Sequence, residues 1–288
     1  MVFSFRRAGR LVVLIGCAAL VLTGAARFGV NRFLSSTRGK AMVSDRLGTA
    51  IGMPVEVSEV DVGADGSSFR FRVMDPGDPK AEVLNVPSAS TDLSAADFVT
   101  GRVAPTTLHL KGAALTLRLA PDGSVLTPLP VLPSGREPFP AVSIDGASLS
   151  LHQAGRPNFA LSGVNVKLAP TGDLIVVSGT VSDPKWGVWT IRGELRRDTH
   201  TGWVELASTN APLDRELLET IPLLPRGTFD DVSALGRAAV PVRLALGEDR
   251  SVQPTVEIRP TLSLFGAPLG PCFRLTHTSD GYLFEPVR

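Results

Sequence analysis

Apolar residues follow two different periods along the chain. Between residues 33 and 53 they recur every three or four positions with charged residues between them, which predicts an amphipathic helix. The helix is expected to end at Gly52-Met53-Pro54, because glycine favours helix termination and proline cannot continue a helix. After Pro54 the spacing changes to two, as in a β-strand, with one slip typical of a β-bulge. The residues in this first alternating run are Val55, Val57, Val60 and Val62.

Runs with this two-residue alternation then recur toward the end of the chain, separated mostly by turns rich in Gly, Pro and Asp. About a dozen strands at spacings near ten residues favour an antiparallel meander over alternating strands and helices. Two further short helices are expected at residues 93–99 and 213–221. The expected fold is therefore mostly β: an N-terminal transmembrane or signal-anchor helix, then an antiparallel meander forming a curved open groove or a sandwich, with a few short helices.

The N-terminus has the pattern of a membrane or export segment. Arg6, Arg7 and Arg10 precede an apolar run at residues 11–26, which is slightly shorter than the roughly 17–25 residues of a spanning helix. A retained anchor is preferred, although cleavage after Ala26 and acylation of Cys17 are alternatives. The expected anchor residues are Leu11, Val12, Val13, Leu14, Ile15, Leu20, Val21 and Leu22.

A proline-rich stretch at residues 127–140 lacks any period and is the best candidate for a boundary. The expected organisation is a membrane anchor or signal segment at residues 1–32, a helix with a first β subdomain at 33–126, this linker, and a second β subdomain at 141–288.

Composition narrows the classes of function. The chain has 29 Lys and Arg residues against 28 Asp and Glu residues. Such a balance argues against binding to nucleic acid, which needs a clustered basic excess. The 28 Gly and 23 Pro residues suit many short strands joined by turns. The only cysteines are Cys17 and Cys272, so no disulfide framework is expected.

No group of residues predicts catalysis. The four histidines lack partners at metal-ligand spacing and are expected to be solvated. The sequence contains no nucleophile-elbow, phosphate-loop or dinucleotide motif. Cys272 is expected to be packed, and Asp230-Asp231 to cap a turn. Trp186, Trp189 and Trp203 are expected in packing contacts, with a lipid interface as the alternative. The chain is therefore predicted to be no enzyme and to have neither cofactor nor metal.

An ordered series of motifs resembles the N-terminal region of the AsmA-like proteins, relatives of TamB and of the wider bridge-like lipid transfer group. After the membrane segment, the helix ends in Leu47-Gly48-Thr49-Ala50-Ile51-Gly52-Met53-Pro54-Val55-Glu56-Val57. Phe71-Arg72-Val73-Met74-Asp75-Pro76-Gly77 follows, then Leu108-His109-Leu110-Lys111-Gly112-Ala113-Ala114-Leu115-Thr116-Leu117 leading into Asp122-Gly123.

The resemblance implies a single-pass protein of the bacterial inner membrane with its body in the periplasm. It implies a role in lipid binding and transport or in outer-membrane maintenance, with membrane lipid and other envelope proteins as partners. The alternatives are a non-catalytic periplasmic interaction scaffold and, last, a cryptic hydrolase. In a groove, the apolar strand faces would contact lipid. The candidates for this contact are Leu115, Leu117, Leu119, Val164, Val166, Val242, Leu244 and Leu246.

The leader gives a first testable prediction. If residues 11–26 are a retained anchor, the protein fractionates with the membrane and carbonate washing does not release it, because the apolar segment stays in the bilayer. The measurement is immunoblotting of washed membrane and supernatant, with N-terminal sequencing of the mature protein. A soluble body that begins at Arg27 would contradict the anchor.

Overall fold

The computed structural model describes most of the chain from residue 32 onward. The described residues are 29, 32–100, 104–121, 125–128, 139–199, 201–222, 236–247, 252–260, 263–264, 267–268, 272–278 and 281–287. The expected membrane segment at residues 11–26 lies outside these ranges. Within them, no helix is long and apolar enough to span a bilayer.

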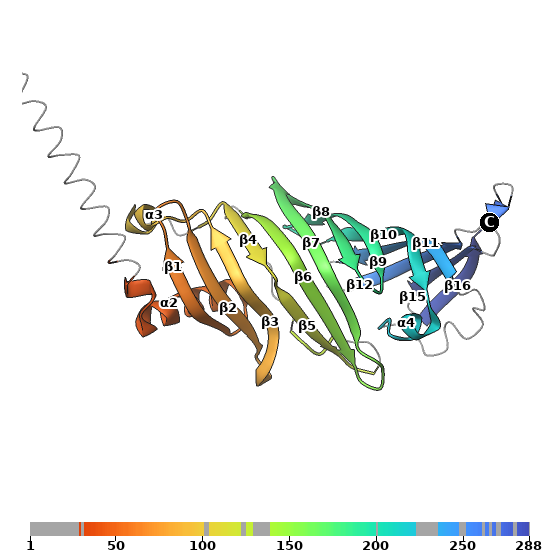
Figure 1. The fold of residues 1–288 in the computed structure, drawn as a ribbon, viewed down its shortest axis with the longest axis horizontal. Coiled ribbons are helices and arrows are strands. Elements are labelled where there is room, and N and C mark those ends of the chain that lie inside the picture. Colours follow the sequence, from red (N-terminus) through yellow and green to blue (C-terminus); the bar gives the residue numbers. More distant parts are fainter. Residues whose placement is uncertain are drawn as a thin grey trace, which may run out of the picture.

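One long sheet holds nearly all the described strands, as Figure 1 shows. Fourteen strands pair in the order β1-β2-β3-β4-β6-β7-β8-β9-β10-β11-β12-β15-β16, with β5 beside β3 and β6, and β13 and β14 form a separate pair. The protein is therefore mostly β with a few short helices, as the alternation predicted. The first strands are β1 (Val55–Val62), β2 (Ser67–Asp75), β3 (Asp78–Thr91), β4 (Thr107–Lys111), β5 (Ala114–Leu119), β6 (Ala141–Gln153), β7 (Phe159–Thr171) and β8 (Leu174–Asp183). The remaining strands are β9 (Gly187–Arg196), β10 (Gly202–Leu213), β11 (Gly236–Leu246), β12 (Val252–Pro260), β13 (Ser263–Leu264), β14 (Ala267–Pro268), β15 (Cys272–Thr278) and β16 (Gly281–Val287).

The first described helix, α2 (Thr37–Ile51), ends where the sequence signals predicted and begins inside the expected range of residues 33–53. The Ser36 side chain accepts a hydrogen bond from the Gly39 N–H at 3.2 Å and so caps the N-terminus. Gly52 ends the helix with φ 75°, a left-handed conformation that glycine adopts without a steric penalty. The two other helices are α3 (Ala95–Thr100) and α4 (Arg215–Glu219), close to their expected positions.

Helix α2 covers the edge strand β1. The Ser44 hydroxyl accepts a hydrogen bond from the Val57 N–H at 3.1 Å, and the Lys40 ammonium donates to the Ser58 carbonyl. These bonds satisfy backbone groups that an edge strand would otherwise offer to another chain. The apolar side of the helix packs on the sheet core through Val43, Leu47 and Ile51.

The bulge expected in β1 is confirmed. The pairing of β1 with β2 shifts between Val57 and Glu59, so that the valines before and after the shift lie on one face. In β2 the alternation is equally regular: Phe71 and Val73 are buried, while Arg70 and Arg72 are exposed.

Strand β3 was not predicted from the alternation. Its buried residues Val83, Val86 and Ala89 are three apart, because the pairing with β2 shifts at several positions along it. Three-residue spacing is the period of a helix rather than of a strand, so the pattern conceals the extended structure.

The sheet departs from a pure antiparallel meander at one place. Strands β4 and β5 run on either side of Gly112, and both pair with β6 in parallel. Parallel neighbours need a crossover connection, and the proline-rich segment at residues 127–140 lies within it. Since β6 begins at residue 141, hydrogen bonds join the segments before and after this linker.

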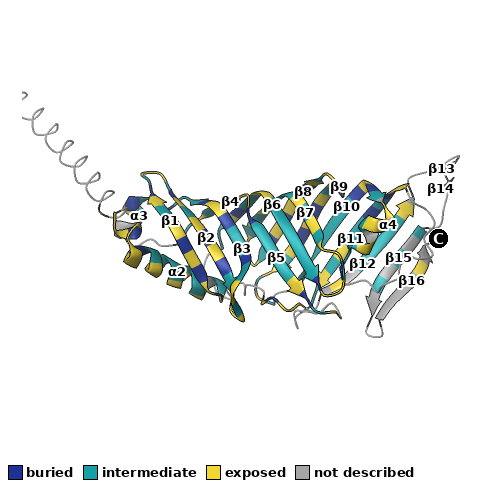
Figure 2. Ribbon diagram, turned by 60° about the horizontal axis from the view of Figure 1, so that its bottom comes forward, coloured by how far each residue is buried: buried dark blue, intermediate teal, exposed yellow. Residues whose placement is uncertain are grey.

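The described hydrophobic clusters form between strands that are neighbours in the sheet. The first joins α2 to strands β1 through β6, the third spans β7 to β10, and the fourth spans β9 to β12. Figure 2 shows buried and partly buried positions distributed along the row of strands from β1 to β12. The core is therefore spread along the sheet.

Gly179 gives a prediction about the middle of the sheet. A Cβ at this position would lie 2.2 Å from the Asn165 carbonyl oxygen and 3.0 Å from the Val166 Cα, both in the backbone of β7. Gly179→Ala should therefore lower the free energy of unfolding by about 1–3 kcal/mol, since overpacking forces the backbone to move. Ser178→Ala at the adjacent exposed position is the control, expected to change stability by less than about 0.5 kcal/mol in denaturant titration. Equal denaturation midpoints for the two variants would contradict the close approach of Gly179 to the β7 backbone.

Candidate functional site

A continuous line of paired apolar residues crosses the sheet. Strand register connects one residue in each strand of the main path from β1 to β16, and every member of the line is apolar. Its members are Val60, Phe69, Ala89, Leu110, Ile144, Val166, Gly179, Ile191, Leu206, Val242, Val256, Leu275 and Phe284. Directly paired residues lie on the same face of a sheet. The backbone register thus aligns the line along one face, which we call the apolar face.

The adjacent register line is polar on the opposite face. Each of its members from β1 to β15 follows or precedes a member of the apolar line in its own strand. These members are Asp61, Ser68, Ser90, His109, Ser143, Lys167, Ser178, Arg192, Glu205, Arg243, Thr255 and Thr276. The sheet thus has one apolar and one polar face along its length.

The eight residues predicted to contact lipid share the apolar face. Val166 and Val242 belong to the central line, and Leu244 pairs with Val204 in the adjacent line on the same face. Leu115 and Leu117 pair with Leu149 and Leu151, Val164 pairs with Val181, and Leu246 pairs with Gly202. Leu119 is buried, with 4% of its surface exposed, whereas the other seven are partly exposed.

Two carboxylates, Asp75 and Asp183, lie at the ends of strands β2 and β8, at one rim of the apolar face. Asp75 closes β2, and its side chain accepts a hydrogen bond from the Gly77 N–H at 2.8 Å and pairs with the Arg118 guanidinium. The Gly77 N–H and the Arg118 charge together hold the pKa of Asp75 below its usual value.

Asp183 closes β8 at the same rim. It accepts hydrogen bonds from the Ser162 hydroxyl at 2.7 Å and from the Lys185 and Trp186 N–H groups at 2.7 and 2.9 Å. Burial alone would raise the pKa of this carboxyl, but these hydrogen bonds outweigh it and lower the pKa. The carboxylate thereby fixes the turn that carries Trp186.

Trp186 and α4 border a hollow of about 320 Å³ at this rim. Leu149, Leu161 and Leu217 contribute apolar side chains to it. The Trp186 ring packs on Phe159 with centroids 5.3 Å apart.

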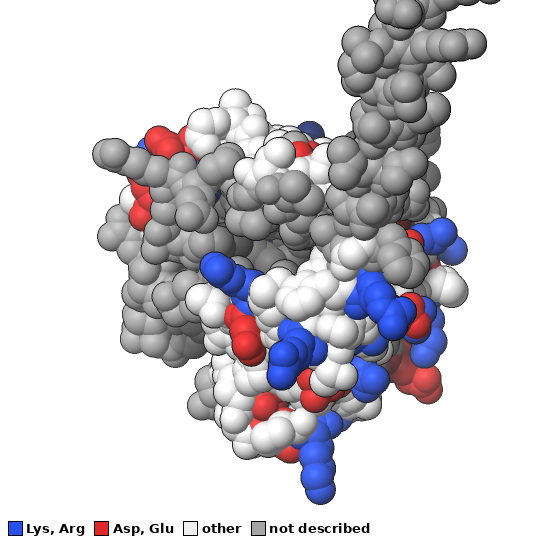
Figure 3. Space-filling view, turned by 90° about the vertical axis from the view of Figure 1, so that its left-hand side faces the viewer, with Lys and Arg blue, Asp and Glu red and all other residues white. Residues whose placement is uncertain are grey.

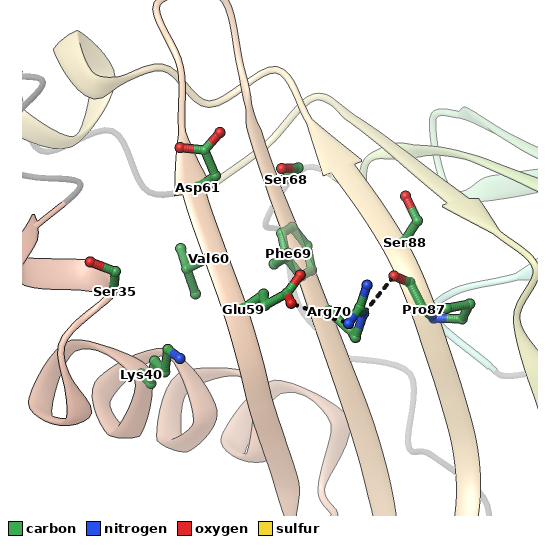
Figure 4. A pocket seen from close by; sticks show the side chains of 10 residues that line it. All are labelled: Ser35, Lys40, Glu59, Val60, Asp61, Ser68, Phe69, Arg70, Pro87 and Ser88. Atoms are coloured by element: carbon green, nitrogen blue, oxygen red, sulfur yellow. Dashed lines mark hydrogen bonds and ion pairs between the residues drawn. The ribbon is translucent and has the colours of Figure 1, made fainter.

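A second hollow, of about 460 Å³, lies where α2 meets β1 to β3. Figure 4 shows Arg70 in its wall, held by hydrogen bonds to the Glu59 carboxylate and the Pro87 carbonyl. The hollow is lined by two cations, Lys40 and Arg70, and two acids, Glu59 and Asp61, so it offers no unbalanced charge to a ligand.

The tryptophans form no single cluster. Trp186 and Trp189 lie together, since the Trp189 indole N–H donates to the Trp186 carbonyl at 2.7 Å. Trp203 lies on the polar face, in the same strand as Glu205, with the Arg243 guanidinium 4.7 Å from its ring centroid. Packing contacts thus account for all three indoles.

Among the described residues, no three His, Cys, Asp or Glu side chains are grouped as metal ligands. His109 is exposed on the polar face, and His152 pairs across the sheet with Arg118. Cys272 is a free thiol, while Cys17, His200, Asp230 and Asp231 lie outside the described residues.

Sequence reasoning missed several members of the apolar face. Phe159, Leu161 and Leu206 extend it, and Gly179 and Gly193 interrupt its side chains in β8 and β9. No local signal identifies them, because membership of the face depends on register between strands rather than on sequence distance.

No family model matches this chain, and neither a curated protein nor a solved structure matches it.

Asp183 gives a prediction with a defined pH dependence. Asp183→Ala should lower the free energy of unfolding by about 1–3 kcal/mol at neutral pH, because four donors lose a charged acceptor. The folded-state pKa lies below the ordinary 3.8, so the contribution is fully present above that pH and is lost as pH falls through the folded value. Denaturant titrations of the wild type and the variant from pH 7 to pH 3 measure the gap between their free energies of unfolding. This gap should narrow only below about pH 4. A gap that widens on acidification would contradict this role.

Proposed function

We propose that this chain is a membrane-anchored envelope protein of the AsmA-like type that binds the acyl chains of membrane lipids along its apolar face. In this proposal residues 11–26 hold the chain in the inner membrane and the sheet lies in the periplasm. The protein takes part in lipid transport or outer-membrane maintenance without catalysing a reaction.

The unbroken apolar register line carries the proposal. A face that contacted water would normally interrupt such a line with polar residues, as the opposite face does at every strand from β1 to β15. A large continuous apolar surface in a protein usually marks contact with another molecule or with lipid. Acyl chains suit it because they need dispersion contact and no hydrogen-bond partners.

An open groove accounts for the packing better than a closed sandwich. In a sandwich, side chains from two facing sheets interdigitate, so a cluster would mix strands far apart in the sheet. Each described cluster instead draws its strand residues from neighbouring strands. The partial exposure of Leu115, Val166 and Leu244 also fits a face that another molecule completes.

The length of the apolar face suits several acyl chains. Strands about 4.8 Å apart along the main path give a face roughly 60 Å long. One leaflet supplies about half of a bilayer core of roughly 30 Å, so acyl chains could lie one after another along the face. The polar rim that carries Asp75 and Asp183 would remain in water beside the headgroups.

Paired substitutions on opposite faces test the proposal. Val166→Asp with Val242→Asp places two carboxylates on the central line, where contact with hydrocarbon would desolvate them. Lipid bound per protein, measured by mass spectrometry after purification in mild detergent, should fall by more than about tenfold. Ser178→Asp with Thr190→Asp is the control, because it adds the same charge at exposed positions and should retain the lipid.

Unfolding measurements accompany the lipid measurement. Retained folding with lost lipid in the first variant supports an open groove, because an empty groove leaves the carboxylates hydrated. Lipid-free wild-type protein, together with global unfolding of the first variant, would refute lipid binding and favour the periplasmic interaction scaffold.

A further inference from the structure

The net positive charge of the chain lies at its N-terminal end. Residues 1–51 contain 8 of the 29 basic residues and only 1 of the 28 acidic residues. The remainder therefore has 21 basic and 27 acidic residues and is net negative, although the whole chain is close to neutral. Such asymmetry between parts of a chain points to an anionic surface as partner for the basic part.

Part of this basic charge lies on the outward side of α2. Arg38, Met42 and Arg46 are four residues apart and therefore lie along one helix face, and all three are exposed. Asp45, also exposed, is the one acid within α2. The opposite side of the helix holds Val43, Leu47 and Ile51 against the sheet.

Exposed apolar side chains accompany the arginines. Met42 has 46% of its surface exposed and Phe33, just before α2, has 50%. They are two of the six large apolar side chains that are exposed in the described part of the chain. Arginine beside exposed aromatic and aliphatic residues is the composition of helices that lie in a membrane interface. Figure 3 views this end of the molecule, where Lys and Arg side chains lie on the surface beside uncharged ones, with Asp and Glu side chains among them.

The sequence also keeps this surface close to the bilayer. Five residues separate Ala26, at the end of the apolar run, from Arg32. Even fully extended, they span no more than about 20 Å, so an anchored chain holds the start of the described body within reach of the headgroups.

We propose that the outward face of α2, formed by Arg38, Met42 and Arg46 with Phe33 before it, docks on the anionic surface of the membrane that holds the anchor. This inference rests on the proposed anchor. The arginines meet lipid phosphates while Met42 and Phe33 enter the interface. Docking sets the orientation of the sheet, so that the β1 end of the apolar face is held next to the bilayer.

The experiment uses the full chain in nanodiscs of phosphatidylcholine alone or with a third phosphatidylglycerol. Met42→Cys, in a Cys17→Ser, Cys272→Ser background, carries an environment-sensitive fluorophore. Its emission should shift to the blue only with phosphatidylglycerol, and rising salt should reverse the shift because it screens the arginines. Hydrogen exchange of the α2 peptides, measured on wild-type protein, should slow in the same discs.

Charge reversal identifies the contact. Arg38→Glu with Arg46→Glu should weaken the phosphatidylglycerol-dependent protection by more than about thirtyfold, given the usual contribution of each cation at an anionic surface. Arg192→Glu with Arg196→Glu, at exposed positions on the polar face, is the control and should leave the protection unchanged.

The outcomes separate this inference from the proposed function. A chain that co-elutes with nanodiscs but shows the same emission and exchange in both lipids would overturn docking alone. The outward face of α2 would then be assigned to an acidic protein partner instead of the membrane. A chain that does not co-elute with nanodiscs would overturn both the anchor and the docking.

Discussion

Register between neighbouring strands is the constraint on which this protein depends. Side chains alternate between faces with a period of two, so a slip of one residue would place Lys167 and Arg192 among the apolar residues. The bulges keep the phase correct where the alternation in a strand fails. In β1 the shift after Val57 returns Val60 to the apolar face, and in β6 a shift after Ile144 returns Leu149 to it. One apolar face therefore persists across strands whose sequences show no common pattern.

Polar contacts cover one edge and one rim of the sheet. Helix α2 covers the edge of β1 with Ser44 and Lys40, which protects it from pairing with another chain. At one rim Asp75 and Asp183 are held by backbone N–H groups, and both keep a lowered pKa and hence their charge. An apolar face beside a charged rim matches the chemistry of an amphipathic ligand better than that of a soluble metabolite.

The proposals assign different tasks to different parts of one sheet. In these proposals, hydrocarbon would contact the apolar face and lipid headgroups would contact α2, where basic charge and exposed apolar side chains coincide. Joined end to end, the two surfaces would offer a lipid a path from the membrane onto the protein. The net negative remainder of the body would not bind an anionic surface, so attraction at α2 alone would orient the molecule.

Local physics determined much of this protein from its sequence. Gly52 and Pro54 end α2, period two marks most strands, and the slip between Val57 and Val60 is the observed bulge. The alternation also assigned Val166 and Val242 to an apolar strand side, but it could not align them, because register is set by pairing between distant segments. Nor could it reveal β3, whose bulges imitate a helical period, or the parallel placement of β6 beside β4 and β5. Periodicity is a property of one strand, whereas a continuous face depends on hydrogen bonds between strands, and only the tertiary structure supplies them.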